Sequence, residues 1–304
     1  MSFLTLFLPR KRSINAMANR PRVVLITGCS SGFGMLAALR LASAGCCVYA
    51  TMRDPLKRVA LDEEARRRGC SSNVRVCALD VADPSSVRIV VDEIVAREGR
   101  IDVLINNAGF GIGGFFEDLS DEDWRWQFDT NFFGVLNVTR AVAARMRPLR
   151  SGRIINISSM SAYSGLPALS AYVSSKWALE GFSECLHLEL KQFNIDVILV
   201  EPASYRTRIF DDNARYARGF LNPDSPYYDL SVRLKELNDI HVRMNNRDPE
   251  EVAKKIEALV FCRNPRFRNI IGVVAKLRAW TVRHVPFELY AWTVQKALNG
   301  MTRK

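Results

Sequence analysis

The segment RVVLITGCSSGFG (residues 22–34) decides the fold of this chain. It opens with a continuous apolar run, Arg22 to Thr27, which is typical of a strand buried on both faces. Glycines then follow in the spacing Gly-x-x-x-Gly-x-Gly, and a helical pattern runs from about Met35 to Ala44. The glycines permit close approach to the backbone, and a helix N-terminus attracts negative charge. The segment therefore predicts a site for the phosphates of a dinucleotide.

Apolar strands and helices alternate along the chain after this segment. Pro84 fits the first turn of a helix, and Ser120 with the acids that follow it is typical of a capped helix, here running to about Arg147. This alternation predicts a single-domain Rossmann α/β fold, with helices on both faces of a doubly wound parallel sheet. A chain of 304 residues, 48% of them hydrophobic, can bury such a core. The other predicted strands comprise residues 46–51, 73–79, 101–106, 153–158 and 195–200, and further helices comprise about 56–68 and 250–261.

The end of the second predicted strand bears on which cofactor would bind. An acid at this position accepts a hydrogen bond from the ribose hydroxyl of NAD, whereas an arginine pairs with the 2′-phosphate of NADP. The chain has Met52, then Arg53, then Asp54. Arg53 beside a non-acidic Met52 favours NADP(H), while Asp54 leaves NAD(H) as the alternative. Asp80, at the end of the third strand, could accept a hydrogen bond from the adenine amino group.

A second stretch, Ser159 to Lys176, carries groups suited to proton transfer. Tyr172 and Lys176 stand four residues apart in a predicted helix from Ala171 to about Phe193, so they share one face. An ammonium at about 4 Å, in an effective dielectric near 20, could lower the pKa of a phenol by about three units. Ser159 ends a predicted strand and could reach the same site. A hydroxyl, a tuned phenol and an ammonium suit proton exchange with a carbonyl or alcohol oxygen.

These motifs together resemble the short-chain dehydrogenase/reductase family, over about residues 22–210. The glycine loop from Thr27 to Gly34 resembles the family's cofactor loop, and Asn106-Asn107-Ala108-Gly109 resembles its strand-four signature. Within the family, the Arg-Asp pair and the Ser-to-Lys stretch are most similar to hydroxysteroid and retinol dehydrogenases. One departure is Ala203, where relatives mostly have glycine.

The resemblance implies a role for each matching residue. Tyr172 is the expected acid/base, and Lys176 lowers its pKa and holds the nicotinamide ribose. Ser159 binds the substrate oxygen, and Asn131 supports a proton path. The expected cofactor-binding residues are Gly28, Ser30, Ser31, Gly32, Phe33, Gly34, Arg53, Asp80, Val81, Asn107, Ala108, Gly109, Tyr172, Lys176, Pro202 and Thr207.

The segment from Tyr205 to Asn246 has loose periodicity and many aromatic residues. In the family this insert covers the substrate, so a bulky apolar ketone or secondary alcohol of steroid, retinoid or lipid type is expected. One alternative is a long-chain acyl ketone, such as 3-ketosphinganine or a 3-oxoacyl thioester. Another is a non-catalytic NADP(H)-sensing interaction protein, which the presence of both Tyr172 and Lys176 disfavours.

The positive charge lies at the two ends of the chain. The net charge is +11, yet residues 263–304 alone hold nine Lys/Arg against one acid, Glu288, and residues 1–22 hold five Arg/Lys and no acid. This pattern argues against a nucleic-acid groove and favours terminal contacts with an anionic surface. We therefore expect a flexible basic leader (1–21), a catalytic domain (22–272) and a basic aromatic tail (273–304) that Pro286 breaks into two helices. The tail either lies on a membrane or packs over the substrate cleft or a dimer neighbour.

Several further expectations follow. The seven cysteines and three histidines show no metal-ligand spacing, so no metal site is predicted. The apolar run Met1–Leu8 precedes its basic residues, the reverse of a secretory signal, and is too short to span a bilayer. A cytoplasmic protein, with peripheral membrane association as an alternative, is expected. The resemblance also implies a homodimer formed through helices 124–147 and 171–193.

Overall fold

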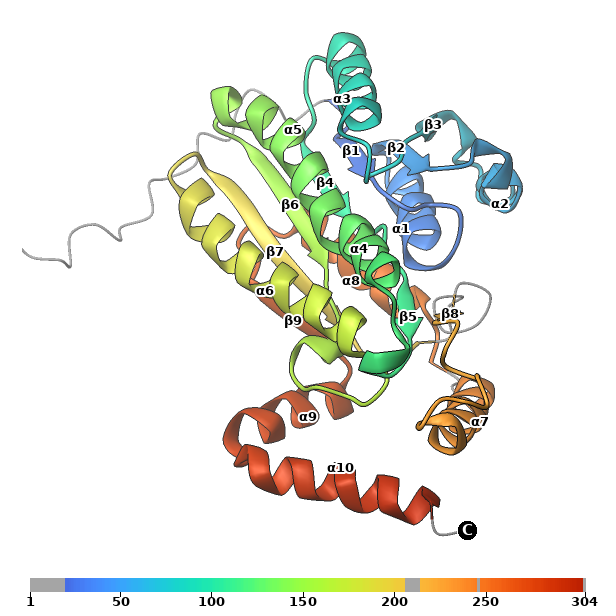
Figure 1. Cartoon of the computed structure of the whole chain (residues 1–304). Coiled ribbons are helices and arrows are strands. Elements are labelled where there is room, and N and C mark those ends of the chain that lie inside the picture. The colour runs from blue at the N-terminus through green and yellow to red at the C-terminus, as the bar shows by residue number, and fades with distance from the viewer. Residues whose placement is uncertain (1–19, 206–213, 245–246, 303–304) are drawn as a thin grey trace, which may run out of the picture.

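The computed structural model describes residues 20–205, 214–244 and 247–302. Its centre is a parallel seven-stranded sheet in the order β3-β2-β1-β4-β6-β7-β9 (Figure 1). This is the doubly wound parallel sheet that the sequence predicts. The strands are β1 (Val23–Ile26), β2 (Cys47–Met52), β3 (Val74–Ala78), β4 (Val103–Asn106), β6 (Gly152–Ile157), β7 (Ile195–Pro202) and β9 (Arg268–Ile271). A small second sheet pairs β5 (Gly111–Gly113) with β8 (Ala214–Tyr216).

Helices cover both faces of the central sheet, because alternate residues of each buried strand point to opposite sides. Val24 and Ile26 of β1 pack in one core with helices α1 and α8, whereas Val23 and Leu25 pack in the other with α3, α5 and α6. The helices are α1 (Gly32–Ser43), α2 (Val59–Arg67), α3 (Pro84–Glu98), α4 (Asp121–Phe128), α5 (Gly134–Leu149), α6 (Ser170–Lys191), α7 (Tyr228–Met244), α8 (Glu250–Phe261), α9 (Val273–His284) and α10 (Phe287–Thr302).

The order of the strands reverses at β1, which pairs with β2 on one side and β4 on the other. In open α/β sheets, ligands bind in the crevice beyond the carboxyl ends of the strands at such a switch point. The glycine loop follows β1. The Asn106–Gly109 segment, called the β4 motif below, begins at the last residue of β4. The topology therefore brings the two motifs to this crevice.

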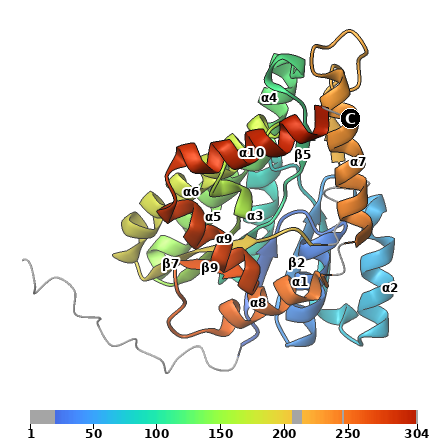
Figure 2. The same cartoon turned by 90° about the horizontal axis from the view of Figure 1, so that it is seen from below.

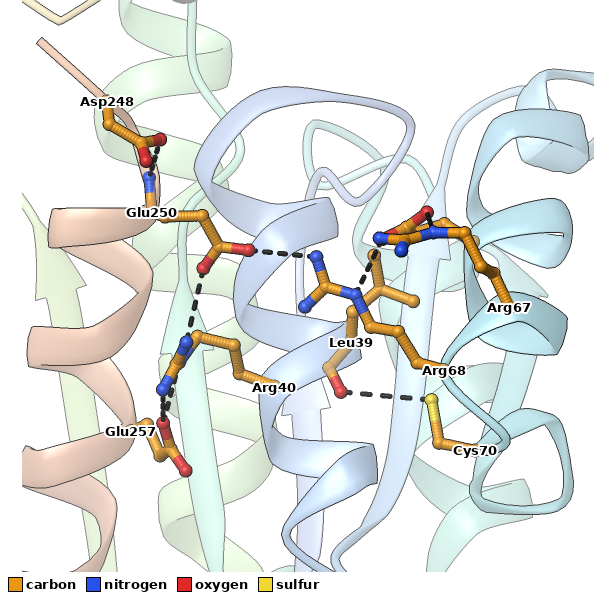
Figure 3. A network of polar contacts seen from close by, with 9 residues as sticks. Leu39, Arg40, Arg67, Arg68, Cys70, Asp248, Glu250 and Glu257 are labelled. Carbon is orange, nitrogen blue, oxygen red and sulfur yellow. Dashed lines mark hydrogen bonds and ion pairs between the residues drawn. The ribbon is translucent and has the colours of Figure 1, made fainter.

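A polar network on the surface fixes the helix that follows the glycine loop (Figure 3). Arg40 of α1 pairs with Glu257 of α8 at 2.6 Å and with Glu250 at 3.4 Å. Glu250 also accepts a hydrogen bond from Arg68, at the end of α2, at 2.9 Å, and Arg68 forms a second ion pair with Glu64 of α2. These side chains are partly exposed, so each pair contributes about 1 kcal/mol or less. The network ties α1 to its two neighbours.

Several elements differ from the sequence prediction. The single helix expected from Ser120 to about Arg147 is interrupted by a π-helical turn, Asp129–Phe133, between α4 and α5. Ser120 does cap α4, in a capping box with Asp123. Helix α7, strand β8 and strand β9 were not predicted, because their segments show no clear period. The α8 bounds and the two tail helices on either side of Pro286 agree with the prediction.

The tail packs against the loop that precedes α6. Ala275 and Ala279 of α9 are buried against Met160 and Tyr163, and the Tyr290 hydroxyl of α10 donates to the Gly165 carbonyl at 2.6 Å. Figure 2 shows α10 running from α9 across to α7, which it contacts. Among the described helices, none is both long enough and apolar enough to cross a membrane.

Candidate active site

The glycine loop and the β4 motif fit together with no space for larger side chains. Gly28 has φ +73°, and a Cβ there would lie 2.8 Å from the Cα of Ala108. A Cβ on Gly34 would lie 2.4 Å from both the Gly28 carbonyl oxygen and Asn107 Nδ2. Asn107 Nδ2 donates to the carbonyls of Thr27 and Gly28, each at 2.9 Å. Glycine is therefore required by the close approach, and the two motifs form one rigid edge.

A cavity of about 510 Å³ lies along this edge. Its backbone wall and the N-terminus of α1 provide donors for phosphate groups, so the residues present fit a dinucleotide. Most of the predicted cofactor residues line it: Gly28, Ser30, Ser31, Gly32, Phe33, Arg53, Val81, Asn107, Ala108 and Gly109. Gly34 lies directly beneath the loop. Pro202 is buried at the end of β7, and Thr207 lies outside the described residues.

The tip of β2 places two cations at one end of this cavity. Arg53 and Asp54 line it, and so does Lys57, which the sequence reasoning missed. The Asp54 carboxylate accepts from the backbone N–H of Leu56 at 3.0 Å and so caps the short helix Pro55–Arg58. The spacing of Lys57, four residues beyond Arg53 in the following helix, was the signal that could have identified it.

Asp80 follows the end of β3 by two residues, and its expected contact with the adenine amino group stays a prediction. Its carboxylate accepts from the backbone N–H of Ala82 at 3.0 Å, within its own turn. Its neighbours Leu79 and Val81 line the cavity. Apolar side chains thus form this part of the wall, and Leu79 was not among the predicted residues.

Asn131 lies in the π-helical turn and is 1% exposed. Its amide accepts from the backbone N–H of Phe110 at 3.1 Å and donates to the Phe110 carbonyl at 2.9 Å and to Ser175 Oγ at 3.2 Å. A Cβ on Gly109 would lie 3.2 Å from Asn131 Oδ1 and 3.8 Å from Lys176 Nζ. Asn131 and Lys176 therefore meet beside the end of the β4 motif.

Tyr172 and Lys176 lie on one face of α6, as their spacing predicts, and both are buried. Lys176 Nζ donates to the Ile157 carbonyl at 2.9 Å and lies 5.9 Å from the centroid of the Tyr172 ring. The Tyr172 ring passes 3.5 Å from where a Cβ on Gly111 would be, so Gly111 leaves room for it. Ser159 follows β6, and its hydroxyl accepts from the Ser161 N–H at 3.0 Å.

The electrostatics of Tyr172 differ from the sequence expectation, which was that Lys176 lowers the pKa of the phenol. Burial raises the pKa of Tyr172, and a hydrogen-bonding interaction with Ser159 opposes this only in part. Burial also lowers the pKa of Lys176 to about 8, against the opposing charge of Glu180. Desolvation is the largest effect on the phenol, so in this structure its pKa lies above the ordinary value and not below it. The phenol is therefore protonated at neutral pH and can donate a proton.

A second cavity, of about 250 Å³, opens beside the Tyr172 phenol. Phe220, which is 2% exposed, stacks on Tyr216 with ring centroids 4.8 Å apart and forms one wall. The segment Leu166-Pro-Ala-Leu169 forms another wall. The sequence analysis did not identify it, although its position between Ser159 and Tyr172 was a signal. The mainly apolar lining includes Leu166, Pro167, Ala168, Leu169, Tyr216, Phe220 and Leu234, with Arg215, Lys235 and Asn238 as polar members.

Comparison with known families agrees with this geometry. The sequence model described as short chain dehydrogenase matches residues 22–216. This stretch includes the glycine loop, the β4 motif and the Ser159–Lys176 stretch.

Individual proteins with similar sequences or structures share most of the chain's length. A 3-ketodihydrosphingosine reductase of Bacteroides thetaiotaomicron is 38% identical over 266 residues, which cover 86% of this chain and 93% of that protein. Retinol dehydrogenase 8 of Bos taurus is 35% identical over 260 residues, covering 83% of this chain and 82% of that protein. A short-chain dehydrogenase/reductase of Burkholderia phymatum, solved in complex with NAD, is 26% identical with a TM-score of 0.76, covering 89% of this chain and 95% of that one.

Proposed function

Because the chain belongs to the short-chain dehydrogenase family and is an NAD(P)-dependent oxidoreductase, we propose that it interconverts a ketone and a secondary alcohol on a bulky apolar substrate. The observation that carries the proposal is the buried, protonated Tyr172 phenol in the wall of a mainly apolar cavity. A protonated phenol can give its proton to a carbonyl oxygen, as reduction of a ketone requires.

Each polar side chain near the phenol has a proposed part. Tyr172 protonates the substrate oxygen, and the Ser159 hydroxyl hydrogen-bonds the same oxygen. Lys176 holds the ribose and supplies positive charge beside the phenol. Asn131 fixes the backbone at Phe110 and the Ser175 hydroxyl, and so keeps α6 in register with the β4 motif. A bound reduced nicotinamide supplies the hydride to the substrate carbon.

Replacement of Tyr172 by Phe tests this assignment. The variant keeps the ring and loses the proton donor, so ketone reduction should fall by about 10²- to 10⁴-fold. NADPH affinity should stay within about threefold, since the phenol oxygen is one contact among many. Tyr227→Phe is the matched control, because Tyr227 is an exposed phenol that donates to Glu117 at 3.1 Å. Retention of reduction within tenfold in Tyr172→Phe would overturn the mechanism.

We propose NADP(H) as the preferred cofactor. Arg53 and Lys57 place two cations at the end of the cavity where a 2′-phosphate would lie, and Asp54 is engaged in capping the next helix. Titration of the protein with NADPH and NADH, followed by thermal shift, measures the preference. Arg53→Ala should lose about tenfold or more in NADPH affinity and change NADH affinity little, since a charged hydrogen bond contributes about 1.5–3 kcal/mol. Equal losses for both cofactors would remove the proposed phosphate contact.

Two substrate classes fit the apolar cavity. A steroid- or retinoid-like ketone fits its aromatic and aliphatic walls, and the resemblance to retinol dehydrogenase 8 favours this class. A long-chain acyl ketone is the second candidate, favoured by the 38% identity to a 3-ketodihydrosphingosine reductase. Both keep the same chemistry at Tyr172.

We further propose that the chain forms a homodimer through α5 and α6. These helices expose large apolar side chains, including Phe133 in the preceding turn, Leu149 and Leu188. Leu188→Glu would place a charge on this face, so sedimentation analysis should show a shift from dimer to monomer. A mass that is monomeric for both proteins would contradict the proposal.

The tail presents a surface suited to an anionic membrane. Val273, Leu277 and Trp280 repeat at helical spacing on α9 and are all more than half exposed. Ala275 and Ala279 on its opposite side are buried against the loop, so the packed face and the exposed face are distinct. Lys276 is the residue next to Leu277 of this face, and residues 263–304 carry nine basic residues against one acid. We propose that this face rests on anionic lipid, as basic amphipathic helices with tryptophan do.

Co-sedimentation with vesicles tests the membrane proposal. Binding should require phosphatidylglycerol in the vesicles and should weaken with salt, because the attraction is partly electrostatic. The double change Leu277→Ser and Trp280→Ser should reduce binding about tenfold or more, since each exposed side chain loses its apolar contact. Ile89→Ser is the matched control, because Ile89 is an exposed apolar residue on α3, away from the tail. Equal binding of all three proteins would remove the role of α9.

A further inference from the structure

A group of buried charged side chains lies one helical turn beyond Lys176. Glu180 follows Lys176 by four residues on α6, and Glu201 is the residue before the last of β7; their exposed fractions are 7% and 0%. Arg268 of β9 contacts the Glu180 carboxylate and, at 3.0 Å, Glu201 Oε1. Buried charges persist only when they are paired, so Arg268 is the group that allows two carboxylates to lie so close together. Lys176, Glu180, Arg268 and Glu201 together carry no net charge.

Tyr163 lies between the Glu180–Arg268–Glu201 group and helix α9 of the tail. The Tyr163 hydroxyl donates to Glu201 Oε1 at 2.6 Å, and the Arg283 guanidinium of α9 lies 4.8 Å from the centre of its ring. Burial raises the pKa of Tyr163, and the hydrogen bond to Glu201 adds to this, so the phenol is a neutral donor. The acid pair is thus buried behind Lys176.

Few charged groups act on Lys176. On α6 they are Tyr172, whose pKa burial raises, and Glu180. Strand β6 contributes the neutral carbonyl of Ile157, and Tyr163, Glu201 and Arg268 are the groups beyond Glu180. On the side of the π-helical turn Asn131 is neutral and Asp129 is exposed. Glu180 is the one described acid whose charge raises the pKa of Lys176.

Arg268 in turn determines whether Glu180 carries its charge. Burial raises the pKa of Glu180, and the neighbouring Glu201 raises it further. A hydrogen-bonding interaction with Ser158 opposes both effects, and so do the charge and the hydrogen bond of Arg268. Loss of Arg268 would therefore favour the neutral form of Glu180 and remove the counter-charge of Lys176.

We propose that Glu180 is a positioning residue that keeps the Lys176 ammonium charged, and that Arg268 keeps Glu180 ionised by bridging it to Glu201. The inference rests on the proposed function, in which Lys176 acts on Tyr172 and on the ribose. Glu180, Arg268 and Glu201 line neither cavity. Under this proposal they nevertheless set the pH above which Lys176 loses its proton and turnover falls.

A titration of the protein without cofactor measures the effect directly. Lysine labelled with ¹³C at Cε gives a resonance for Lys176 that is identified by its loss in Lys176→Met. In the wild-type protein this resonance should titrate near pH 8. In Glu180→Gln the midpoint should fall by about one unit or more, as expected when an opposite charge one turn away on the same buried helix face is removed. An unchanged midpoint would overturn the inference.

Two further variants separate charge from folding. Glu184→Gln is the matched control: Glu184 stands on the same helix and pairs with the same Arg268 at 3.1 Å, yet its side chain is 64% exposed. It should leave the Lys176 midpoint within about 0.3 unit, because solvent screens its charge. Arg268→Gln should lower the midpoint as Glu180→Gln does, and it decides the matter if Glu180→Gln does not fold. A downward shift in Glu184→Gln equal to that in Glu180→Gln would contradict a specific role for the buried acid.

The pH profile of NADPH-dependent ketone reduction gives the functional readout. The alkaline limb of kcat/KM should move down by about one pH unit in Glu180→Gln, and Glu180→Asp should restore most of it because the charge is kept. A Glu180→Gln protein with lower Tm and an unmoved limb would show a structural role only and overturn the inference. A wild-type protein with no reductase activity would instead overturn the proposed function, and the resonance titration would still decide the role of Glu180.

Discussion

The cofactor cavity and the substrate cavity of this protein are built in different ways. Backbone forms much of the first, where glycines at positions 28 and 34 leave no space for a Cβ against the β4 motif. Side chains form the second, from the loop at residues 166–169, from β8 and from α7. Three of its lining residues, Ala168, Tyr216 and Phe220, belong to a small separate core and not to the cores of the main sheet.

This difference shows which parts of the molecule can vary independently. The edge of the first cavity, where the backbone packs closely at Gly28 and Gly34, tolerates few changes. A cavity lined by side chains of a satellite core can change its shape while the sheet stays the same. Tyr172 lies at the boundary, because its position is fixed by α6 while its ring lines the substrate cavity.

The sharpest test of this contrast compares two helical glycines. A Cβ on Gly34 would clash with the Gly28 carbonyl, whereas a Cβ on Gly181 meets nothing within 4 Å. Gly34→Ala should weaken NADPH binding about 10- to 100-fold, since overpacking costs about 1–3 kcal/mol. Gly181→Ala should keep the affinity and gain up to about 1 kcal/mol of stability from helix propensity. Fluorescence titration measures the NADPH affinity of each variant, and thermal unfolding measures its stability. Equal NADPH affinities of the two variants would contradict the claim that close packing at Gly34 shapes the cofactor cavity.

A change on the substrate side should affect a different parameter. Phe220→Leu removes the stacking partner of Tyr216 while it keeps an apolar side chain in the wall. We expect KM for the ketone to rise about threefold to tenfold, since such a pair contributes about 0.5–1.5 kcal/mol. NADPH affinity should stay unchanged. A loss of NADPH binding in this variant would show that the two cavities are coupled.

The pH dependence of ketone reduction should be set by Lys176, beside Tyr172, and should therefore be the same for every substrate. Lys176 has a pKa near 8, lowered by burial. It is charged below that pH and loses its proton above it, so reduction should be constant below about pH 8 and fall by up to tenfold per unit above it. Profiles of kcat/KM with two ketones of different shape check this. If the alkaline limbs of the two profiles differed by more than one pH unit, the titrating group would lie in the substrate or the substrate cavity and would not be Lys176.

The smallest effect is expected from the surface network in Figure 3. Arg68→Ala removes ion pairs to Glu64 and Glu250, which are partly exposed. The loss should be about 1 kcal/mol or less, which corresponds to a Tm lower by about 2–4 °C. Turnover and NADPH affinity should not change. A large loss of NADPH affinity would mean that the position of the cofactor loop depends on this network.

Local patterns predicted the cofactor side well. The apolar run before Gly28, the helical spacing of Tyr172 and Lys176 and the proline at Pro84 each report on structure within a few residues. The doubly wound parallel sheet and most strand bounds follow from them. Lys57 was missed although its spacing from Arg53 was visible in the sequence.

The rest depends on contacts between distant segments. Arg268 meets Glu180 across 88 positions of the chain, and no local period signals such a pair. The π-helical turn around Asn131 looks like ordinary helix in sequence, and α7 lies in a segment with loose periodicity. The pKa of Tyr172 was misjudged for the same reason, because burial is a property of the folded chain.

The central claim is that this protein reduces an apolar ketone with Tyr172 as the proton donor. It is tested most directly by incubating the protein with NADPH deuterated at C4 and a panel of steroid, retinoid and long-chain acyl ketones. We predict that at least one ketone yields an alcohol with deuterium at the carbinol carbon, in an amount equal to the NADPH oxidised. NADPH binding without any alcohol across the panel would contradict the claim and favour a cofactor-sensing interaction protein.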